Sequence, residues 1–268
     1  MMTDEVESAA RSASRSHPFQ VVARLGYAVN GLLHILIGGI AIGVARGTGG
    51  EADASGALSG LAATPGGIFV LWTIVIGLAA LGLWQVAEAI LVPSPDPKRK
   101  WGHRAIELGK AVAYLAIAGT ALSFAMGGSS DSGGDAQGFT AALLATPGGI
   151  VVLVIVGLGV CVIGGFFVVK GVTKKFTEDL TVPSGTVGRV VVGLGIGGYV
   201  AKGIALGVVG ILFLVAAFTV DASESSGLDG ALKALVELPF GPAILIVVAI
   251  GLIAYGLYSF VRARRARL

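Results

Sequence analysis

The sequence predicts an all-α, polytopic membrane protein with six transmembrane helices arranged as three tandem two-helix repeats. Three observations predict it. Of the 268 residues, 54% are hydrophobic and only 13% are charged, whereas an ordinary soluble domain carries about 25% charged residues. Six segments without charges are long enough to cross a bilayer, which takes about 20 residues at 1.5 Å of helix rise per residue. The same pattern of glycine, proline and aromatic residues also recurs three times.

Composition excludes several other classes of protein. The 19 basic and 16 acidic residues are too few to cover a soluble protein of this length. Disordered chains are polar and poor in aliphatic residues, unlike this one. The formal charge of +3 is too small to predict binding to nucleic acid. Cys161 is the one cysteine, so we expect a small buried hydrophobe and neither a disulfide nor a metal site.

The charge-free segments place the helices in order along the chain, near residues 21–45, 67–91, 105–126, 148–171, 190–219 and 240–262. The first of these is too long for the core of a signal peptide, so we expect it to remain as a helix. Residues 1–20 are polar and are expected to form a disordered cytoplasmic tail. The three repeats then cover residues 21–92, 105–173 and 189–262.

Six spans place both termini on the same side of the membrane. The segment from Pro93 to Arg104 and the C-terminal tail are rich in lysine and arginine, while the alternate loops are acidic. Cytoplasmic loops carry an excess of basic residues. We therefore expect a multi-pass protein of the bacterial plasma membrane with both termini in the cytoplasm.

The second helix of each repeat follows one motif. A proline is followed two residues later by a glycine, and two further glycines stand 12 and 17 residues after the proline. The motif residues are Pro65, Gly67, Gly77 and Gly82; Pro147, Gly149, Gly159 and Gly164; and Pro239, Gly241, Gly251 and Gly256. Proline suits the first turn of a helix, so we expect it there. Glycines let helices approach closely in lipid, so we expect helix contacts at these positions.

The first helices of the repeats align as well, with Gly26-Tyr27, Gly109-Lys110 and Gly198-Tyr199 at the same position. Each repeat holds two helices, so all three have the same orientation. Their symmetry axis is therefore expected to run along the membrane normal. The short segments before the prolines, such as residues 58–63 and 231–238, are expected at the outer interface.

These residues carry a resemblance to a known family. The early Gly-Tyr and the Gly-Leu pairs of the second helix, such as Gly77-Leu78 and Gly82-Leu83, make residues 20–262 similar to the DUF1206 family of bacterial, mainly actinobacterial, membrane proteins. The resemblance implies a six-helix membrane protein and transfers no catalytic residue. Where that family often has Arg-Gly, this chain has Asn30-Gly31, Ala113-Tyr114 and Lys202-Gly203.

Polar residues at membrane depth are the candidate functional residues, because burying them in lipid is costly. The candidate intramembrane polar site consists of Tyr27, Asn30, His34, Tyr114, Tyr199 and Lys202. Two interpretations stay open. The residues either line a polar cavity that opens to the cytoplasm, or they form a helix–helix seam with snorkelling ends.

Charged residues at the helix ends suggest an ion pair in two of the hairpins. In an antiparallel hairpin the start of the first helix lies beside the end of the second. We therefore expect Arg24 to pair with Glu88, and Glu107 to pair with Lys170 with the signs exchanged.

No nucleophilic side chain stands at a spacing from a general base that predicts catalysis. We therefore expect that the chain is not an enzyme. The run from Gly193 to Gly198 matches a dinucleotide fingerprint, but it continues into a membrane span instead of a strand–turn–helix unit, so no cofactor is expected.

The expected function is a structural or partner-interaction helical bundle. The alternative is a small-solute or ion transporter or channel with a site between the repeats. The lipid bilayer is the expected partner, and binding of another protein or of a second copy is left open.

One structural feature separates these two functions. An uninterrupted cavity lined by His34, Tyr114 and Lys202 favours transport. A dry centre packed by glycines favours the structural bundle.

Overall fold

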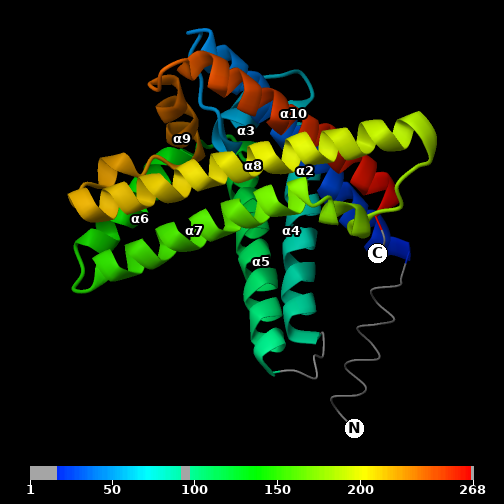
Figure 1. Ribbon diagram of the computed structural model, residues 1–268, viewed down its shortest axis with the longest axis horizontal. Helices are drawn as coiled ribbons and strands as arrows, with labels where there is room; N and C mark the ends of the chain where they lie inside the picture. The colour runs from blue at the N-terminus through cyan, green and yellow to red at the C-terminus, as the bar shows by residue number, and fades with distance from the viewer. Residues whose placement is uncertain (1–16, 92–96, 267–268) are drawn as a thin grey trace.

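A computed structural model describes residues 17–91 and 97–266, and these residues form helices and their connections (Figure 1). The elements are α2 (His17–Ala45), α3 (Ala54–Ala62), α4 (Gly67–Leu91), α5 (Pro97–Ala125), α6 (Ser132–Leu144), α7 (Gly149–Val172), η1 (Lys175–Asp179), α8 (Gly185–Thr219), η2 (Ala222–Glu224), α9 (Gly227–Val236) and α10 (Gly241–Arg265). Six helices, α2, α4, α5, α7, α8 and α10, are long and apolar enough to cross a membrane. Both the fold class and the number of predicted spans are confirmed.

Three of the long helices begin earlier than the charge-free segments predicted. α2 begins at His17, α5 at Pro97 and α8 at Gly185. Charged and polar residues are compatible with a helix once it leaves the hydrocarbon layer, so the absence of charges marks the span and not the whole helix. Of the predicted polar tail, residues 1–16 lie outside the described residues and residues 17–20 belong to α2.

The motif prolines lie in a turn before the helix, and not in its first turn as predicted. The N–H of Gly67 donates to the carbonyl oxygen of Thr64 at 2.9 Å, and that of Gly149 donates to Thr146 at 3.0 Å. The residue after each proline has a positive φ, 79° at Gly66. Proline followed by a residue with positive φ is typical of a type II turn. The helix therefore begins two residues after the proline, because that turn reverses the chain first.

The third copy of this turn carries a strained residue. Phe240 stands where the other two copies have glycine, and its φ is 62°. The left-handed conformation is costly for any residue with a Cβ. The glycine that follows is required for space in all three copies. For example, a Cβ on Gly149 would lie 1.7 Å from the carbonyl oxygen of Leu143.

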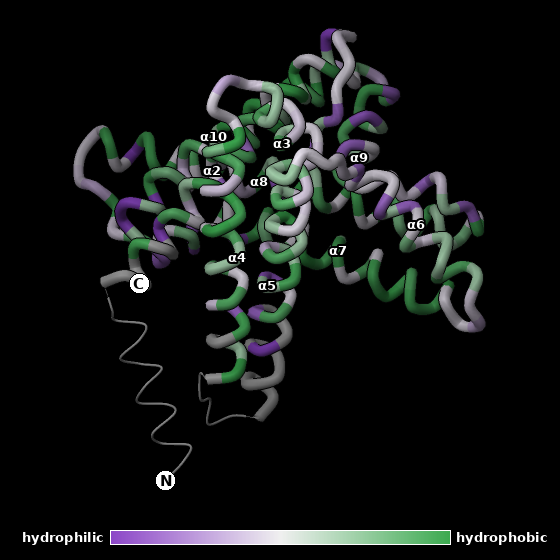
Figure 2. Tube along the Cα trace, turned by 180° about the vertical axis from the view of Figure 1, so that it is seen from behind, coloured by the Kyte–Doolittle hydropathy of each residue, from purple (hydrophilic) through white to green (hydrophobic). Residues whose placement is uncertain are grey.

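The most extensive helix packing joins successive repeats. α4 packs on α5, α7 packs on α8, and α10 packs on α2, as Figure 1 and, from behind, Figure 2 show for α4 with α5. The second helix of each repeat thus contacts the first helix of the next, and the third repeat returns to the first. The sequence predicted two-helix repeats, but the main packing unit combines helices from two of them.

The last motif glycine of each second helix lies at these crossings. A Cβ on Gly164 would lie 2.7 Å from the carbonyl oxygen of Gly203, which is the close approach predicted for glycine. The crossing of α4 with α5 is displaced by about one turn. A Cβ on Gly82 would meet the side chain of Leu115 at 2.7 Å, because Tyr114 occupies the position of Gly203 and is too large for a backbone contact.

The short helices α3, α6 and α9, together with η2, form what we call the short-helix layer. Hydrogen bonds join the three repeats within it. The N–H of Ser132 donates to the hydroxyl of Ser55 at 3.0 Å. The hydroxyl of Ser225 donates to that of Thr140 at 2.7 Å, and the N–H of residue 52 donates to Asp229 at 2.8 Å. This layer therefore closes a ring of the first, second and third repeats at one end of the molecule.

The α4–α5 pair projects away from the rest of the molecule, with α7 and α8 running across it (Figures 1 and 2). Within the repeats, α2 packs on α4 and α8 packs on α10, but α5 and α7 form no comparable interface in the described part of the chain. The largest core lies between α2, α4, α10 and the C-terminal half of α5, and it includes residues of α3 and α9 in the short-helix layer.

Candidate intramembrane polar site

Four of the predicted polar residues lie within α2 and α8, on the side of these helices that meets the C-terminal half of α10. Tyr27 and His34 extend from α2, and Tyr199 and Lys202 extend from α8. His34, Tyr199 and Lys202 contact Tyr255 of α10, and Tyr27 contacts Arg262 of the same helix. We call the assembly the aromatic–cation cluster, which consists of Tyr27, His34, Phe167, Lys170, Phe176, Asp179, Tyr199, Lys202, Tyr255, Tyr258 and Arg262.

Buried aromatic rings form the centre of the cluster. The Tyr199 ring stacks on Phe176, with centroids 5.2 Å apart and 12° between the planes. Tyr258 meets Phe176 edge-on at 5.2 Å, and its hydroxyl donates to the Phe176 carbonyl oxygen at 3.1 Å. Phe176 enters this space because Gly195 has no side chain, since a Cβ there would lie 2.2 Å from the ring. These contacts fix η1 against α8 and α10.

Two basic side chains lie over aromatic rings. The Lys202 Nζ is 4.4 Å from the ring centroid of Tyr255 and 5.2 Å from that of Phe167. The Arg262 Cζ is 4.4 Å from the ring centroid of Tyr27. Cation–π attraction strengthens when the partners are removed from water. The rings therefore compensate, in part, the cost of placing these charges in a membrane-spanning segment.

Asp179 is the carboxylate that holds the cluster together. Its Oδ2 lies 2.7 Å from Lys170 Nζ and 3.5 Å from Arg262 Nη2. Lys170 ends α7 and Arg262 ends α10, so one acidic residue of η1 links the second helices of two repeats. The three side chains are 20–27% exposed, which places them at the edge of the bundle and not in its centre.

His34 is oriented by its own helix. Its Nδ1 lies 2.8 Å from the carbonyl oxygen of Asn30. A carbonyl oxygen only accepts, so Nδ1 carries the hydrogen. The imidazole ring lies 4.7 Å from that of Tyr255, with 52° between the planes. Asn30 therefore takes part in the site through its carbonyl oxygen, and the His34 ring packs against the Tyr255 ring.

Tyr114 and the predicted ion pairs are arranged differently from the expectation. Tyr114 of α5 packs against the large core. Glu107 forms its ion pair with Lys110 at 2.6 Å, and Lys170 pairs with Asp179, so the predicted pair of Glu107 with Lys170 is replaced by two others. The reason is that α5 and α7 are apart. The side chain of Glu88 lies outside the described residues, so its pair with Arg24 stays a prediction.

Sequence reasoning missed the residues that connect the cluster. Asp179 stands among basic residues in a loop, and no pattern predicts that it turns back to two helices. Tyr255 and Tyr258 are three residues apart and so share a helix face, which is the signal that could have identified them. Phe176 carries no such signal.

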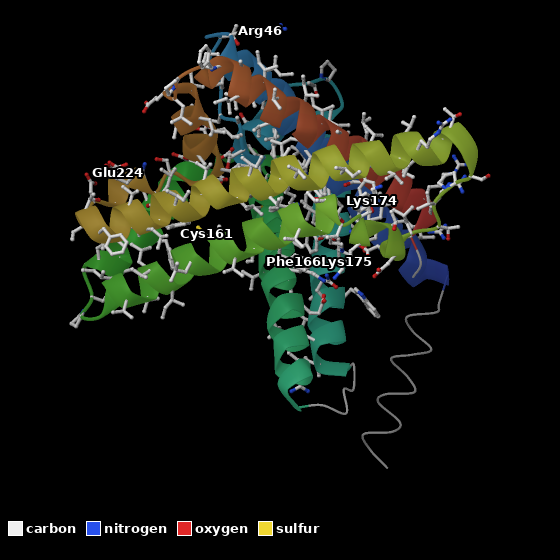
Figure 3. All side chains as sticks on the ribbon, in the orientation of Figure 1. Arg46, Cys161, Phe166, Lys174, Lys175 and Glu224 are labelled. Atoms are coloured by element: carbon white, nitrogen blue, oxygen red, sulfur yellow. The ribbon has the colours of Figure 1, made fainter. Side chains whose placement is uncertain are left out.

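Labelled charged residues mark the two ends of the α7–α8 pair in Figure 3. Lys174 and Lys175 lie at one end of the pair, and Glu224 lies at the other. Cys161 lies between these ends, with its Sγ 3.7 Å from the carbonyl oxygen of Gly207.

Two aspartates outside the spans have shifted pKa values of opposite sign. Burial in the short-helix layer raises the pKa of Asp53, and the nearby carboxylates of Asp229 and Glu51 add to the rise. The hydroxyl and the N–H of Ser223 lower the pKa of Asp221, which is exposed to solvent.

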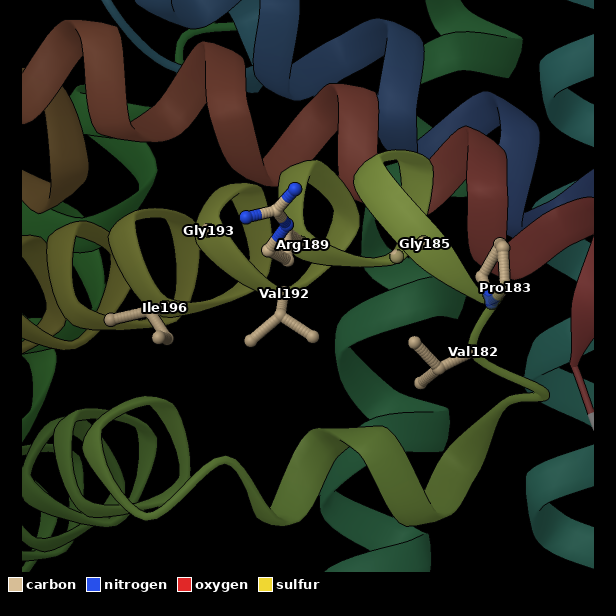
Figure 4. A pocket seen from close by; sticks show the side chains of 8 residues that line it. Val182, Pro183, Gly185, Arg189, Val192, Gly193 and Ile196 are labelled. Atoms are coloured by element: carbon tan, nitrogen blue, oxygen red, sulfur yellow. The ribbon is translucent and has the colours of Figure 1, made fainter.

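A hollow of about 440 Å³ lies beside the start of α8, and none of the predicted polar residues lines it (Figure 4). Val182, Val192 and Ile196 form much of its wall. Gly193 of the dinucleotide-like run is part of α8 here, with no strand before it, so that run lacks the context the fingerprint requires. Among the described residues, no group of three histidine, cysteine, aspartate or glutamate side chains is placed to hold a metal ion.

The fold and the site define a class, the multi-pass α-helical membrane proteins built from three two-helix repeats. The sequence profile described as Domain of Unknown Function (DUF1206) matches this chain three times, at residues 25–91, 108–174 and 197–266. The chain belongs to the DUF1206 family. It is 32% identical over 243 residues to the uncharacterised protein YxxB of Bacillus subtilis strain 168, covering 89% of this chain and 88% of that relative. No solved structure matches the chain.

Proposed function

We propose that this protein is a non-enzymatic helical bundle of the bacterial plasma membrane, with both termini in the cytoplasm, that serves structure and interaction with partners. The observation that carries the proposal is that the polar groups of the candidate site are in contact with other groups of the bundle. Lys202 lies over Tyr255, His34 hydrogen-bonds to its own helix, and Asp179 holds two basic groups. Each is occupied by a neighbour in the bundle.

Glycine contacts between the repeats support the same proposal. The backbones of α7 and α8 approach each other at Gly164 and Gly203, which leaves no room for a solute path at that crossing. Packing of this kind stabilises helix association in lipid. The orientation is supported by the basic residues at the end of α10 and by the acidic residues around the short-helix layer.

A second candidate function, transport of a small anionic solute, is favoured by one specific observation. Lys170, Lys202 and Arg262 lie in one cluster, where Asp179 pairs with Lys170 and Arg262 while Lys202 lies over the Tyr255 ring. Basic groups in excess at membrane depth are typical of sites that recognise anions.

Flux measurements on purified protein in liposomes separate the two functions. We expect no flux of protons, potassium, chloride or phosphate above that of protein-free vesicles, and no change on His34→Ala or Lys202→Met. A saturable chloride or phosphate flux that Lys202→Met abolishes would overturn the first proposal in favour of transport.

A further inference from the structure

In the first and third repeats, the first of the two motif glycines within the second helix faces the first helix of the same repeat. A Cβ on Gly77 of α4 would lie 3.4 Å from the Leu25 side chain and 3.6 Å from that of Val29, both on α2. In return, a Cβ on Gly26 would lie 2.8 Å from the side chain of Leu81. These five residues define the contact within repeat one.

Repeat three makes the same contact with the residues at the same positions. A Cβ on Gly251 of α10 would lie 3.2 Å from the Gly197 carbonyl oxygen and 2.3 Å from the Cβ of Ala201. A Cβ on Gly198 would lie 2.7 Å from the Cβ of Tyr255. Gly197 and Ala201 stand one before and three after Gly198, as Leu25 and Val29 do around Gly26. The register is therefore a property of the repeat.

In repeat two the corresponding residues are all uncovered. They are Leu108, Gly109 and Val112 on α5, and Gly159 and Ile163 on α7. Leu108 is 45% exposed, Val112 68% and Ile163 50%. Within the described part of the chain, a Cβ on Gly109 or on Gly159 would meet no atom within 4 Å. Two surfaces that are paired in the first and third repeats are thus both free in the second.

We propose that α5 docks on α7 of the same chain, with Leu108 and Val112 against Gly159 and with Gly109 against Ile163. The projecting α4–α5 pair is then one of two arrangements of the molecule. In the docked arrangement the six long helices form a closed ring with three equivalent contacts within the repeats. This inference is independent of the proposed function, because it rests on the repeat register alone.

The short-helix layer explains why α7 of the same chain is the partner. α6 connects α5 to α7, and its N–H at Ser132 and hydroxyl at Thr140 bond to the first and third repeats. These bonds fix α6, which connects the end of α5 to the start of α7, against the other two repeats. Docking then requires that α5 moves towards α7 while α4 keeps its contact with α2.

Docking also brings a third set of polar residues towards the aromatic–cation cluster. Lys110 of α5 stands at the position that Tyr27 and Tyr199 occupy in the other repeats, and these two tyrosines are members of the cluster. Lys110 carries its own counter-ion, Glu107, which is buried.

Cysteine cross-linking in native membranes tests the proposal. In a Cys161→Ala background, Val112→Cys with Gly159→Cys is oxidised with copper phenanthroline. The positive control is Val29→Cys with Gly77→Cys, the equivalent pair that is in contact in repeat one. The negative control is Val112→Cys with Leu158→Cys, since residue 158 lies at the same depth but points about 100° away.

The expected result is a disulfide within one chain that forms to an extent similar to the positive control and at least about tenfold more than the negative control. A disulfide between two chains would overturn the proposal, because the partner would then be a second copy. Absence of the disulfide, with the positive control formed, would overturn it as well.

A bulky substitution provides a second and independent test. Gly159 and Gly165 are both exposed on α7, and a Cβ on either meets nothing within 4 Å in the described part of the chain. If α5 docks at Gly159, Gly159→Leu lowers the melting temperature of the purified protein while Gly165→Leu leaves it unchanged. Equal melting temperatures for the two variants would contradict docking.

Discussion

Gly31 and Gly256 bring the backbones of α2 and α10 into direct contact. A Cβ on Gly31 would lie 2.7 Å from the carbonyl oxygen of Gly256, and a Cβ on Gly256 would lie 2.5 Å from that of Gly31. The two residues belong to the first and third repeats, so this contact joins the two ends of the repeated chain. It is equivalent to the contact of Gly164 with Gly203.

Substitution of Gly31 by alanine is therefore expected to separate α2 from α10. A methyl group closer than 3 Å to a backbone oxygen forces the helices apart, and such overpacking costs about 1–3 kcal/mol. The matched control is Gly39→Ala on the same helix, where a Cβ meets nothing within 4 Å among the described residues. Thermal unfolding in detergent is expected to show a lower melting temperature for Gly31→Ala alone. Equal loss in both variants would mean that helix propensity, and not the crossing, is measured.

Phe240→Gly is expected to stabilise the protein. The residue has a φ of 62° in a turn where the other two repeats have glycine, and relief of a left-handed conformation is worth about 1 kcal/mol. The ring is 86% exposed, so little packing is lost. The melting temperature is expected to rise by about 2–4 °C. Phe240→Ala is the control because alanine keeps the strain. A similar rise for alanine would assign the effect to loss of the ring.

Asp179→Asn is expected to loosen the aromatic–cation cluster. The change removes the charge that binds Lys170 and Arg262 and leaves two basic groups close to each other. Hydrogen bonds to charged groups contribute about 1.5–3 kcal/mol, so the free energy of unfolding is expected to fall by about that amount. Glu178→Gln, at the exposed neighbouring residue, is the control. Chemical denaturation measures both variants, and comparable losses would show that Asp179 has no special role.

The sequence predicted the number and the positions of the long helices, which depend on the lipid that surrounds them. A bilayer requires about 20 apolar residues per span, so the charge-free segments predicted six helices in the right places. The repeat was equally readable, because Gly77, Gly159 and Gly251 recur at constant spacing. Positions like these indicate that a helix has a face for close approach.

The sequence predicted less well which helices pack together, because a glycine does not specify which helix approaches it. Gly77 faces its own repeat, whereas Gly82 on the same helix faces the next one. The same limit applies to the site. Lys202 and His34 were predicted from their depth, but their common neighbour Tyr255 stands on a helix that only the tertiary arrangement brings to them. Asp179 is one of several charged residues in its loop, and no pattern distinguishes it from the others.

Asp53 and Asp221 are expected to give stability opposite dependences on pH. Burial raises the pKa of Asp53 in the folded state above the unfolded value of about 3.9. Its stabilising contribution is therefore complete below about pH 4 and is lost as the pH rises through the folded pKa. For Asp221 the Ser223 hydrogen bonds lower the pKa, so its contribution is present above about pH 4 and is lost as the pH falls through the folded pKa.

Melting temperatures of the wild type, Asp53→Asn and Asp221→Asn between about pH 2 and about pH 7.5 measure this difference. Asparagine keeps an oxygen that can accept from the N–H of Gly56, the bond that Asp53 makes at 2.9 Å. The stability of the wild type relative to Asp53→Asn is expected to decrease with rising pH, and that relative to Asp221→Asn to increase. Slopes of the same sign for both variants would contradict this account, because burial and hydrogen bonding act on a carboxylate in opposite directions.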